Sequence, residues 1–352
     1  MSATGSSNPE YVNARVRARR AVLFDDEDYR KLVRMGTGEI ARYMEETEYE
    51  AEMNALGTRH SGVDLIEYAL HENLAKHFHD MLSWAEGQLY EQIANYLRKF
   101  DAWNAKTAIR GVYSGADPES IQTDYIRAGE FDDELLDQLA AADAVEEIVE
   151  LLSGTIFEDG LTQAFEEFEE TDVLVPLENA LDKTFYEHLL GDIDTRMVDR
   201  NTPKGLYLEF LQAEIDFRNV RNALRLSRTE TDLDPEEYYI EGGKLFEEGE
   251  LRQLVGSFDE LVEHIRDSTY GDDLSNALSD LSEAESLVQF EQALDAALLE
   301  YSDTLSHTFP VSICSALSYI LAKEREIENI RAIARGREVG LSVEEIEGEL
   351  VT

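Results

Sequence analysis

Residues 214–225 read EIDFRNVRNALR, and the stretch contains a pattern that organises the whole chain. The pattern is an Asn, a small or branched apolar residue, a Lys or Arg and, four residues after that cation, an Arg. It occurs four times, starting at asparagines that are 91, 115 and 110 residues apart, namely Asn13, Asn104, Asn219 and Asn329. The paired cations of the four copies are Arg15 with Arg19, Lys106 with Arg110, Arg221 with Arg225, and Arg331 with Arg335.

Two further markers recur in the same order along the chain. A hydroxyl residue stands two positions before an aromatic residue at Thr47, Thr155 and Ser268. A segment that reads apolar-Glu-x-Ala-Leu-His/Asp follows, at residues 66–71, 177–182 and 290–295. Recurrence at a fixed spacing indicates internal repeats. We therefore predict three diverged helical units, at residues 1–116, 117–232 and 233–352, the last of which includes an extra Asn/Arg helix at the C-terminus.

The sequence predicts an all-α fold. Apolar residues recur at spacings of three and four, as at Leu135, Leu136 and Leu139, and there are only six Pro. Strand-like alternation between hairpin turns is absent from the sequence. We expect helices to end at Gly111, Gly154, Gly160 and Gly340. A repeat of about 110 residues is far longer than a helix-pair solenoid repeat, so three units indicate a pseudo-threefold body of three similar helical domains.

Each Asn/Arg helix carries its two cations on one face. In the third copy Arg221 and Arg225 fall about 200° and 240° around the helix from Asn219, beside an apolar face. Either the cations bridge acids on a neighbouring helix of their own unit, or they contact acidic groups of a partner protein. The asparagines are interpreted as satisfied buried amides that tie helices together, and we expect this of Asn104, Asn219 and Asn329.

The charge of the chain is strongly negative. Asp and Glu number 76 against 31 Lys and Arg, which gives a net charge of −45. Hydrophobic residues make up 43% of the chain, so a folded core is expected despite this charge. A nucleic acid is excluded as the main partner because phosphates need a basic surface. Acids spread over the whole chain, with Lys scarce, favour a protein that works in molar salt, where the Debye length is about 3 Å; an acidic protein of ordinary salt is the alternative.

The sequence offers no recognisable catalytic device, cofactor site or metal site. The segment Gly242-Gly243-Lys244 lacks the framing of a phosphate-binding loop. His71 and His77 are six apart, whereas a zinc-protease helix needs a spacing of four. His77 and His79 are interpreted as ordinary surface or boundary histidines. Cys314, the only cysteine, is expected to be a small core residue.

Nor does the sequence offer a membrane span. The longest apolar run, residues 311–322, is too short and too polar to cross a bilayer. From the residues alone we expect a noncatalytic helical body with a mechanical or adaptor role.

Four stretches are similar to one known family. They are YVNARVRA at residues 11–18, EIDFRN at 214–219, LAKEREIENIRAI at 321–333 and GLSVEEI at 340–346. The chain resembles the C subunits of archaeal A-type ATP synthases, which are similar to the d subunits of the vacuolar type. The length and the threefold repeat agree with this resemblance.

The resemblance implies a funnel of three helical domains in the central stalk, or rotor. A single copy would sit between the axle, made of the D and F subunits, and the membrane ring of proteolipid subunits, on the cytoplasmic face of the cell membrane. It would transmit torque during ion-driven ATP synthesis, while catalysis takes place on other chains. Two alternatives remain: a helical scaffold unrelated to ATP synthase, and an enzyme that uses an acid-rich metal site.

Overall fold

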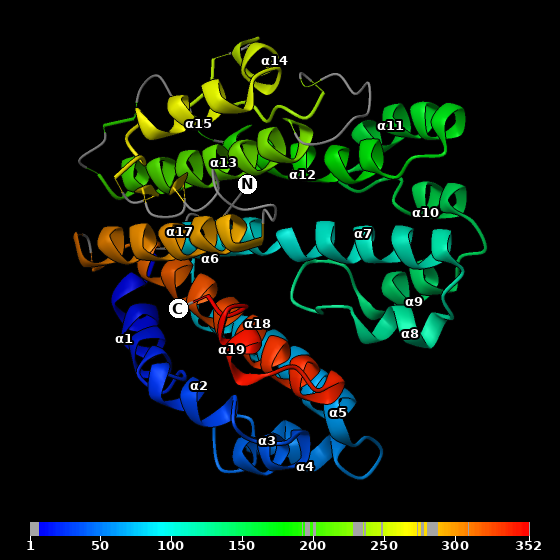
Figure 1. Cartoon of the computed structure of the whole chain (residues 1–352), viewed down its shortest axis with the longest axis vertical. Helices are drawn as coiled ribbons and strands as arrows, with labels where there is room; N and C mark the ends of the chain where they lie inside the picture. The colour runs from blue at the N-terminus through cyan, green and yellow to red at the C-terminus, as the bar shows by residue number, and fades with distance from the viewer. Residues whose placement is uncertain are drawn as a thin grey trace. The chain divides into compact units, whose positions relative to one another are not determined.

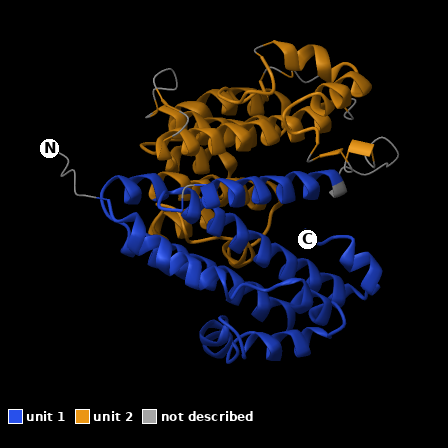
Figure 2. Ribbon diagram, turned by 90° about the vertical axis from the view of Figure 1, so that its left-hand side faces the viewer, with its two compact units in different colours: residues 1–93, 288–352 blue, residues 94–287 orange. Residues whose placement is uncertain are grey.

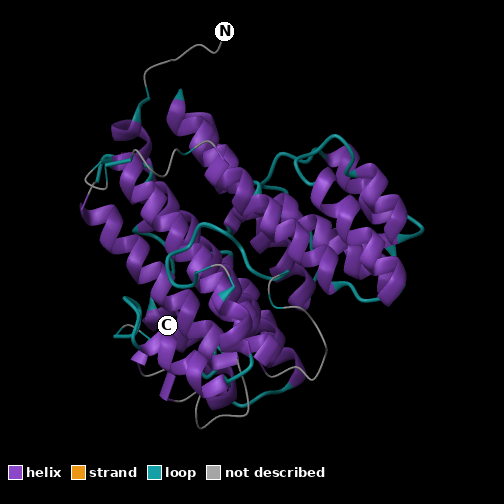
Figure 3. Ribbon diagram, turned by 90° about the horizontal axis from the view of Figure 1, so that it is seen from above, coloured by secondary structure: helices purple, strands orange, loops and turns teal. Residues whose placement is uncertain are grey.

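The computed structural model describes most of the 352 residues. The described residues are 7–191, 193, 198–199, 202–227, 235, 237–247, 249–272, 274–275, 278–279, 288–308 and 310–351. They form helices joined by loops and turns, and they contain no β-strand (Figure 3). The predicted all-α class is confirmed.

The chain forms two compact units, residues 1–93 with 288–352 and residues 94–287 (Figure 2). The first unit combines the two ends of the chain. Its described helices are α1 (Pro9–Arg20), α2 (Asp26–Leu32), α3 (Thr37–Met44), α4 (Glu50–Leu56), α5 (Gly62–Trp84), α17 (Val288–Thr308), α18 (Cys314–Val339) and α19 (Val343–Glu347).

The second unit comprises the middle of the chain. Helix α6 (Gln88–Leu97) runs across the boundary between the units. The remaining helices are α7 (Lys99–Ser114), α8 (Pro118–Thr123), α9 (Asp133–Ala141), α10 (Val145–Leu151), α11 (Glu158–Thr171), α12 (Val175–Gly191), α13 (Pro203–Ser227), α14 (Glu250–Val255) and α15 (Phe258–Arg266). The grouping into two units does not test the predicted boundaries of the three repeats. One of those boundaries, after residue 232, lies outside the described residues.

Helix α18 is the centre of the first unit. It packs against α1, α5 and α17, and also against α2 and α3 (Figure 1). Because neighbours surround it, α18 buries residues on several sides, among them Ile320, Ile327 and Ile330. Cys314 at its first turn is buried, as predicted for a core residue. Because α18 is enclosed by these helices, the side chains that it carries are held in fixed positions.

In the second unit α7 and α12 pack side by side, and α11 packs against α12. Helix α7 also contacts α8, α9 and α10 (Figure 1). Farther along the chain, α13 packs against α14 and α15. Helices α7 and α13, which carry Asn104 and Asn219, therefore each pack against the short helices that follow them in the chain.

The predicted helix ends are correct at two glycines and wrong at two. Gly340 caps α18 with a left-handed backbone of φ 81°, and Gly154 has φ 83° in the turn after α10. Gly111 and Gly160 instead lie inside α7 and α11. A Cβ at Gly111 would overlap the side chain of Ile121, and one at Gly160 would overlap Thr184 Oγ1. These two glycines allow close packing between helices, which a sequence pattern does not distinguish from a helix stop.

His77 departs from its predicted surface or boundary position. It is 3% exposed on the inner face of α5, and its Nδ1 lies 2.5 Å from the hydroxyl of Tyr319 in α18. Burial lowers the pKa of His77 to about 2, and the neighbouring cations Lys323, Arg19 and Lys76 act in the same direction. His77 is therefore neutral in the folded protein. Exposed His79, two residues on, agrees with the predicted surface position.

We predict that His77 makes the first unit sensitive to acid. The unfolded chain gains this proton near pH 6.5 and the folded chain near pH 2. The stabilisation is therefore complete above pH 6.5 and is lost as pH falls below it, at up to about 1.4 kcal/mol per pH unit. His77→Asn, which keeps a polar atom near Tyr319, should reduce this loss. Urea unfolding of the full chain at constant salt, at about pH 7.5 and 5.5, measures it. His79→Asn is the control, and equal losses in wild type and His77→Asn would contradict the prediction.

Candidate functional site

Three of the four repeated asparagines form the same joint. Asn104 donates from Nδ2 to the carbonyl of Ile126 at 2.8 Å and accepts the N–H of the same residue at 2.8 Å. The same pair of bonds joins Asn219 to Ile240 at 2.8 and 2.9 Å, and Asn329 to Val351 at 3.0 and 2.9 Å. We call this two-way bond the Asn clasp. Each clasp fixes a buried backbone position 21 or 22 residues farther along the chain.

The first copy, Asn13, makes a different connection. Its Nδ2 donates to the carbonyls of Pro310 at 3.1 Å and Ser312 at 3.0 Å. Its buried Oδ1 has no hydrogen-bond partner among the described residues. Asn13 therefore ties α1 to the turn that precedes α18, within the first unit.

An acidic residue one turn before each clasp holds a second backbone segment. Asp101 accepts the N–H groups of Glu130 and Phe131, both at 2.9 Å. Asp216 accepts those of Lys244 at 2.7 Å and Leu245 at 2.8 Å. Asn and acid together thus attach two successive loop positions to one face of each helix.

The third such acid, Glu326 in α18, reaches the N-terminal part of the chain. It accepts the N–H of Phe24 at 2.5 Å and the hydroxyl of Tyr49 at 2.5 Å. Tyr49 corresponds in the repeat to Tyr270, whose hydroxyl donates to Asp216 at 2.9 Å. Glu326 of the C-terminal helix α18 therefore binds a backbone N–H and a tyrosine near the N-terminus, as Asp216 of α13 does with residues that follow α13 in the chain.

Burial of these acids is compensated in two ways. Burial raises the pKa of Asp101 to about 6 and raises that of Asp216, although the backbone N–H donors oppose the shift. Glu326 instead has a buried cation beside it, because Lys323 Nζ lies 2.7 Å from its Oε1. Burial lowers the pKa of Lys323 despite the attraction of Glu326.

Glycines allow two loops to approach Asp101 and Asp216 closely. A Cβ at Gly129 would overlap the carboxylate of Asp101, and one at Gly243 would overlap that of Asp216. No glycine stands in the corresponding loop at Phe24. The side chain of Glu326 is one methylene longer, so its carboxylate reaches the backbone without that close approach.

The candidate cations of the second copy form ion pairs inside their own unit. Lys106 Nζ lies 2.6 Å from Asp182 Oδ1, and Arg110 Nε lies 2.5 Å from Glu178 Oε1. Both acids lie on α12, in the marker segment 177–182. Burial opposes the charge of Asp182, but Arg218 and Lys106 hold the pKa of this carboxyl below its usual value.

The fourth copy has the same arrangement on α18. Arg331 contacts the ring of His71, and Arg335 pairs with Glu67; both partners lie on α5, in the marker segment 66–71. In these two copies, an Asn/Arg helix is thus joined to a marker helix by two polar pairs. The contacts are those expected of internal pairing.

The first copy differs from this arrangement. The guanidinium of Arg15 lies over the rings of Tyr11 and Trp84, at 4.7 and 4.9 Å from their centroids. Arg19 pairs with Asp80 and donates to the carbonyl of His77. On α13, Arg221 and Arg225 lie on the same helix as the clasp residue Asn219; Arg221 is half-buried and Arg225 is exposed.

Sequence reasoning missed the acids of these joints. The signal was present, because an acid stands three residues before every repeated Asn, at Glu10, Asp101, Asp216 and Glu326. The marker segments were identified as repeats, but not as the ion-pair partners of the cations.

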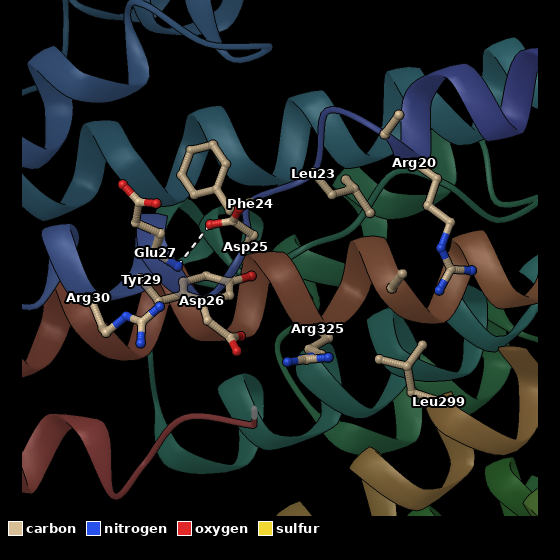
Figure 4. A pocket seen from close by; sticks show the side chains of 12 residues that line it. Arg20, Leu23, Phe24, Asp25, Asp26, Glu27, Tyr29, Arg30, Leu299 and Arg325 are labelled. Atoms are coloured by element: carbon tan, nitrogen blue, oxygen red, sulfur yellow. Dashed lines mark hydrogen bonds between the residues drawn. The ribbon is translucent and has the colours of Figure 1, made fainter.

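The first unit also contains an open pocket of about 680 Å³ between α1, α2, α17 and α18. Arg20, Arg30 and Arg325 line it together with the acidic start of α2 (Figure 4). Two of these groups already serve the fold: Asp25 caps α2 through the N–H of Glu27 at 2.8 Å, and Arg20 pairs with Asp303. These two side chains are therefore already engaged within the protein, and we do not assign a ligand to the pocket.

Two other kinds of site have no candidate in the described part of the chain. No cluster of three or more His, Cys, Asp or Glu suited to a metal ion occurs among the described residues. Within the same residues, no helix combines the length and the apolar character needed to cross a membrane.

Comparison with known proteins identifies relatives along the whole chain. The family model described as "ATP synthase (C/AC39) subunit" matches residues 12–349. The C subunit of the A-type ATP synthase of Haloferax volcanii is 66% identical over 100% of this chain and 99% of the relative. That of Halobacterium salinarum is 57% identical over the same shares, and that of Methanosarcina barkeri is 36% identical over 99% and 94%. The first two sources are halophilic archaea, in agreement with the salt-adapted interpretation of the charge.

We predict that Asn104→Ala destabilises the second unit by about 2–4 kcal/mol, because it leaves the buried N–H and carbonyl of Ile126 without partners. Asn104→Asp should also destabilise, because a carboxylate cannot donate to that carbonyl. Denaturant unfolding of the full chain measures both. Asn179→Ala, at an exposed hydrogen bond on α12, is the control. A change below about 0.5 kcal/mol in Asn104→Ala would contradict a supporting role for the clasp.

We predict unequal contributions from the two ion pairs of α7. Lys106→Met leaves Asp182, whose side chain is only 19% exposed, without its closest cation, and should cost about 3 kcal/mol. Arg110→Ala removes a pair in which the Arg side chain is 53% exposed, and should cost about 1 kcal/mol or less. The double variant Lys106→Met/Asp182→Leu should recover most of the first loss. A double variant as unstable as the sum of its single variants would show that the two residues do not interact.

Proposed function

The chain belongs to the ATP synthase (C/AC39) subunit family, and from this premise we propose that it is the noncatalytic central-stalk component of an A-type ATP synthase. In this role it links the rotor axle to the membrane ring and transmits torque between them. One observation carries the proposal: the match to relatives named as the C subunits of A-type ATP synthases extends over the whole of this chain and nearly the whole of each relative.

The side-chain contacts between helices are suited to a protein that must transmit force. A rotating coupler has to resist shear between its helices while torque passes through it. Backbone bonds inside a helix do not resist such shear, but side-chain joints between helices do. The clasp at Asn104, the pair Lys106–Asp182 and the pair Arg335–Glu67 are joints of this kind. Because each of the two ion pairs is at least partly buried, salt screens them less than fully exposed pairs, and the clasp carries no charge to screen.

We further propose the partners and the place in the cell. The chain sits as a single copy between the axle, made of the D and F subunits, and the proteolipid ring, as a peripheral protein at the cytoplasmic face of the cell membrane. Its three repeat units form a pseudo-threefold funnel, in which equivalent surfaces face the ring and the centre receives the shaft. Membership in the family argues against a scaffold unrelated to ATP synthase.

We predict that deletion of the gene for this chain uncouples the synthase. Membrane vesicles should lose most of their ion-gradient-driven ATP synthesis, while the catalytic heads still hydrolyse ATP once released from the membrane. The wild-type gene should restore synthesis. The purified chain alone should not hydrolyse ATP, in contrast with the expectation for a metal-dependent enzyme. Undiminished synthesis without the chain, or failure of a tagged chain to co-purify with other components of the synthase, would overturn the proposed function.

A further inference from the structure

An exposed apolar patch lies in the second unit, where α7 ends and where α11 leads into α12. Among the described residues ten large apolar side chains are exposed, and three of them are here: Tyr113 at 47%, and Val173 and Val175 at 39% each. Half-buried Phe165 and Phe168 of α11 extend the patch, because the ring of Phe168 lies 6.1 Å from that of Tyr113 and 5.8 Å from that of Phe165. We call these five residues the Tyr113 patch.

The packing of α7 on α12 brings the members of the patch together. The two ion pairs that α7 makes with α12 fall in opposite order along the two helices, so the helices run antiparallel. Tyr113 lies one turn beyond Arg110 on α7, and Val175 lies one turn before Glu178 on α12. Both are therefore at the same end of the helix pair. The hydroxyl of Tyr113 also donates to the carbonyl of Asp172 at 3.1 Å, which fixes the turn between α11 and α12 at the same place.

That turn is held in one shape. Asp172 caps α11 with a left-handed backbone of φ 55°, the only positive φ outside glycine among the described residues. Its N–H donates to the carbonyl of Phe168 at 2.8 Å, while its carbonyl accepts the hydroxyl of Tyr113. The apolar surface is thus preformed, and a partner can bind it without paying for the ordering of the turn.

The border of the Tyr113 patch is acidic. Residues 128–182, which include α9, α10 and α11, contain 18 Asp and Glu and no Lys or Arg. Glu166 and Glu169 are exposed on α11, and Glu169 falls about 40° around the helix from Phe165. Arg110 of α7 adds little positive charge at this border, because it is engaged in the ion pair with α12 described above.

An apolar patch with an acidic border limits the kinds of partner. Nucleic acids and the headgroups of anionic lipids carry phosphates, which the border repels. A second copy of this chain, docked through the same patch, would bring the same acids face to face. A protein surface whose apolar residues are flanked by Lys or Arg is complementary in both respects. Since molar salt screens charges beyond a few ångströms, the apolar contact supplies most of the affinity and the bases select the partner.

We propose that the Tyr113 patch binds another protein of the synthase, through a segment of apolar residues flanked by Lys or Arg. This proposal rests on the proposed function, because it takes the partner from the same complex. Acids also belong to a salt-adapted surface that binds nothing, so the experiments test the apolar residues and the acids separately, each against a matched control.

Photo-crosslinking identifies the occupant. The crosslinking amino acid p-benzoylphenylalanine replaces Val173 in the tagged full chain, expressed in cells that lack the native gene, and the assembled synthase is irradiated. Val22, a valine of the first unit that is 49% exposed, is the matched control. We expect the Val173 probe to link to one peptide of another synthase protein, with apolar residues next to Lys or Arg, at several times the yield of the Val22 probe.

Removal of apolar surface tests the centre of the patch. Val173→Asn/Val175→Asn should lower the amount of chain retained in the purified synthase about tenfold, because polar side chains then replace the exposed apolar contacts. Val22→Asn/Val311→Asn makes the same change at two valines of the first unit that are 49% and 47% exposed, and should be retained as wild type. The melting temperature of each isolated variant controls for folding.

Charge reversal tests the border. Glu166→Lys/Glu169→Lys should lower retention several-fold, because bases then face bases. Glu146→Lys/Glu150→Lys makes the same change in charge at exposed positions of α10, within the same acidic stretch, and should be retained as wild type. Changing the Lys or Arg of the crosslinked partner to Glu should restore retention of the Glu166→Lys/Glu169→Lys chain.

Four results would overturn the proposal: crosslinks of the Val173 probe only to lipid, crosslinks only to a second copy, retention unaffected by Val173→Asn/Val175→Asn, or equal retention of the two charge-reversed chains. If the wild-type chain co-purifies with the synthase but the Val173 probe links to no other protein of the complex, the proposal for the Tyr113 patch fails and the proposed function stands. If the wild-type chain does not co-purify, the proposed function itself fails.

Discussion

The rest of the structure depends on the need to satisfy buried backbone groups in the loops between helices. A loop that crosses a helix surface carries N–H and carbonyl groups that helix formation does not pair, and each one buried without a partner costs about 1–3 kcal/mol. At Ile126, Ile240 and Val351 the N–H and the carbonyl of the same residue are bound by one side chain. Among short side chains, Asn has both the acceptor and the donor for this. Asp101 and Asp216, one turn before the Asn, each accept two backbone N–H groups of the next loop segment. A carboxylate is sufficient there, because both contacts need only an acceptor.

Because these joints are internal, the surface could become acidic without disturbing them. The clasps are neutral, and the buried charges are matched, as in Lys323 with Glu326 and Lys106 with Asp182. Two of the eight Lys are thus used where a cation must be buried beside a carboxylate. Exposed acids repel one another, and molar salt screens that repulsion over a few ångströms. A net charge of −45 is therefore compatible with a framework whose stability rests on buried polar contacts.

The sequence predicted the helices, the repeated asparagines and their burial, because each depends on a local period or on a pattern that occurs several times. Features that depend on a distant segment were missed. Gly111 looks like a helix stop, yet it is small because Ile121 packs against it. His77 looked exposed, because its partner Tyr319 is 242 residues away. The acids three residues before each Asn were visible in the sequence, but among 76 acids only the geometry distinguishes them.

The joints also account for a mismatch in the repeats: four Asn/Arg helices but three marker segments. The marker segment of α5 follows α1 in the order of the repeat, yet its His71 and Glu67 contact Arg331 and Arg335 of α18. Glu326 of the same helix holds Phe24 and Tyr49. The C-terminal helix has thus taken the place that α7 occupies beside α12 in the second unit. Since α18 closes the first unit, α1 packs on it from outside with one face uncovered. Of the four copies, α1 alone makes no clasp: Asn13 donates to the carbonyls of Pro310 and Ser312, and so fastens the start of the chain to the turn that leads into α18.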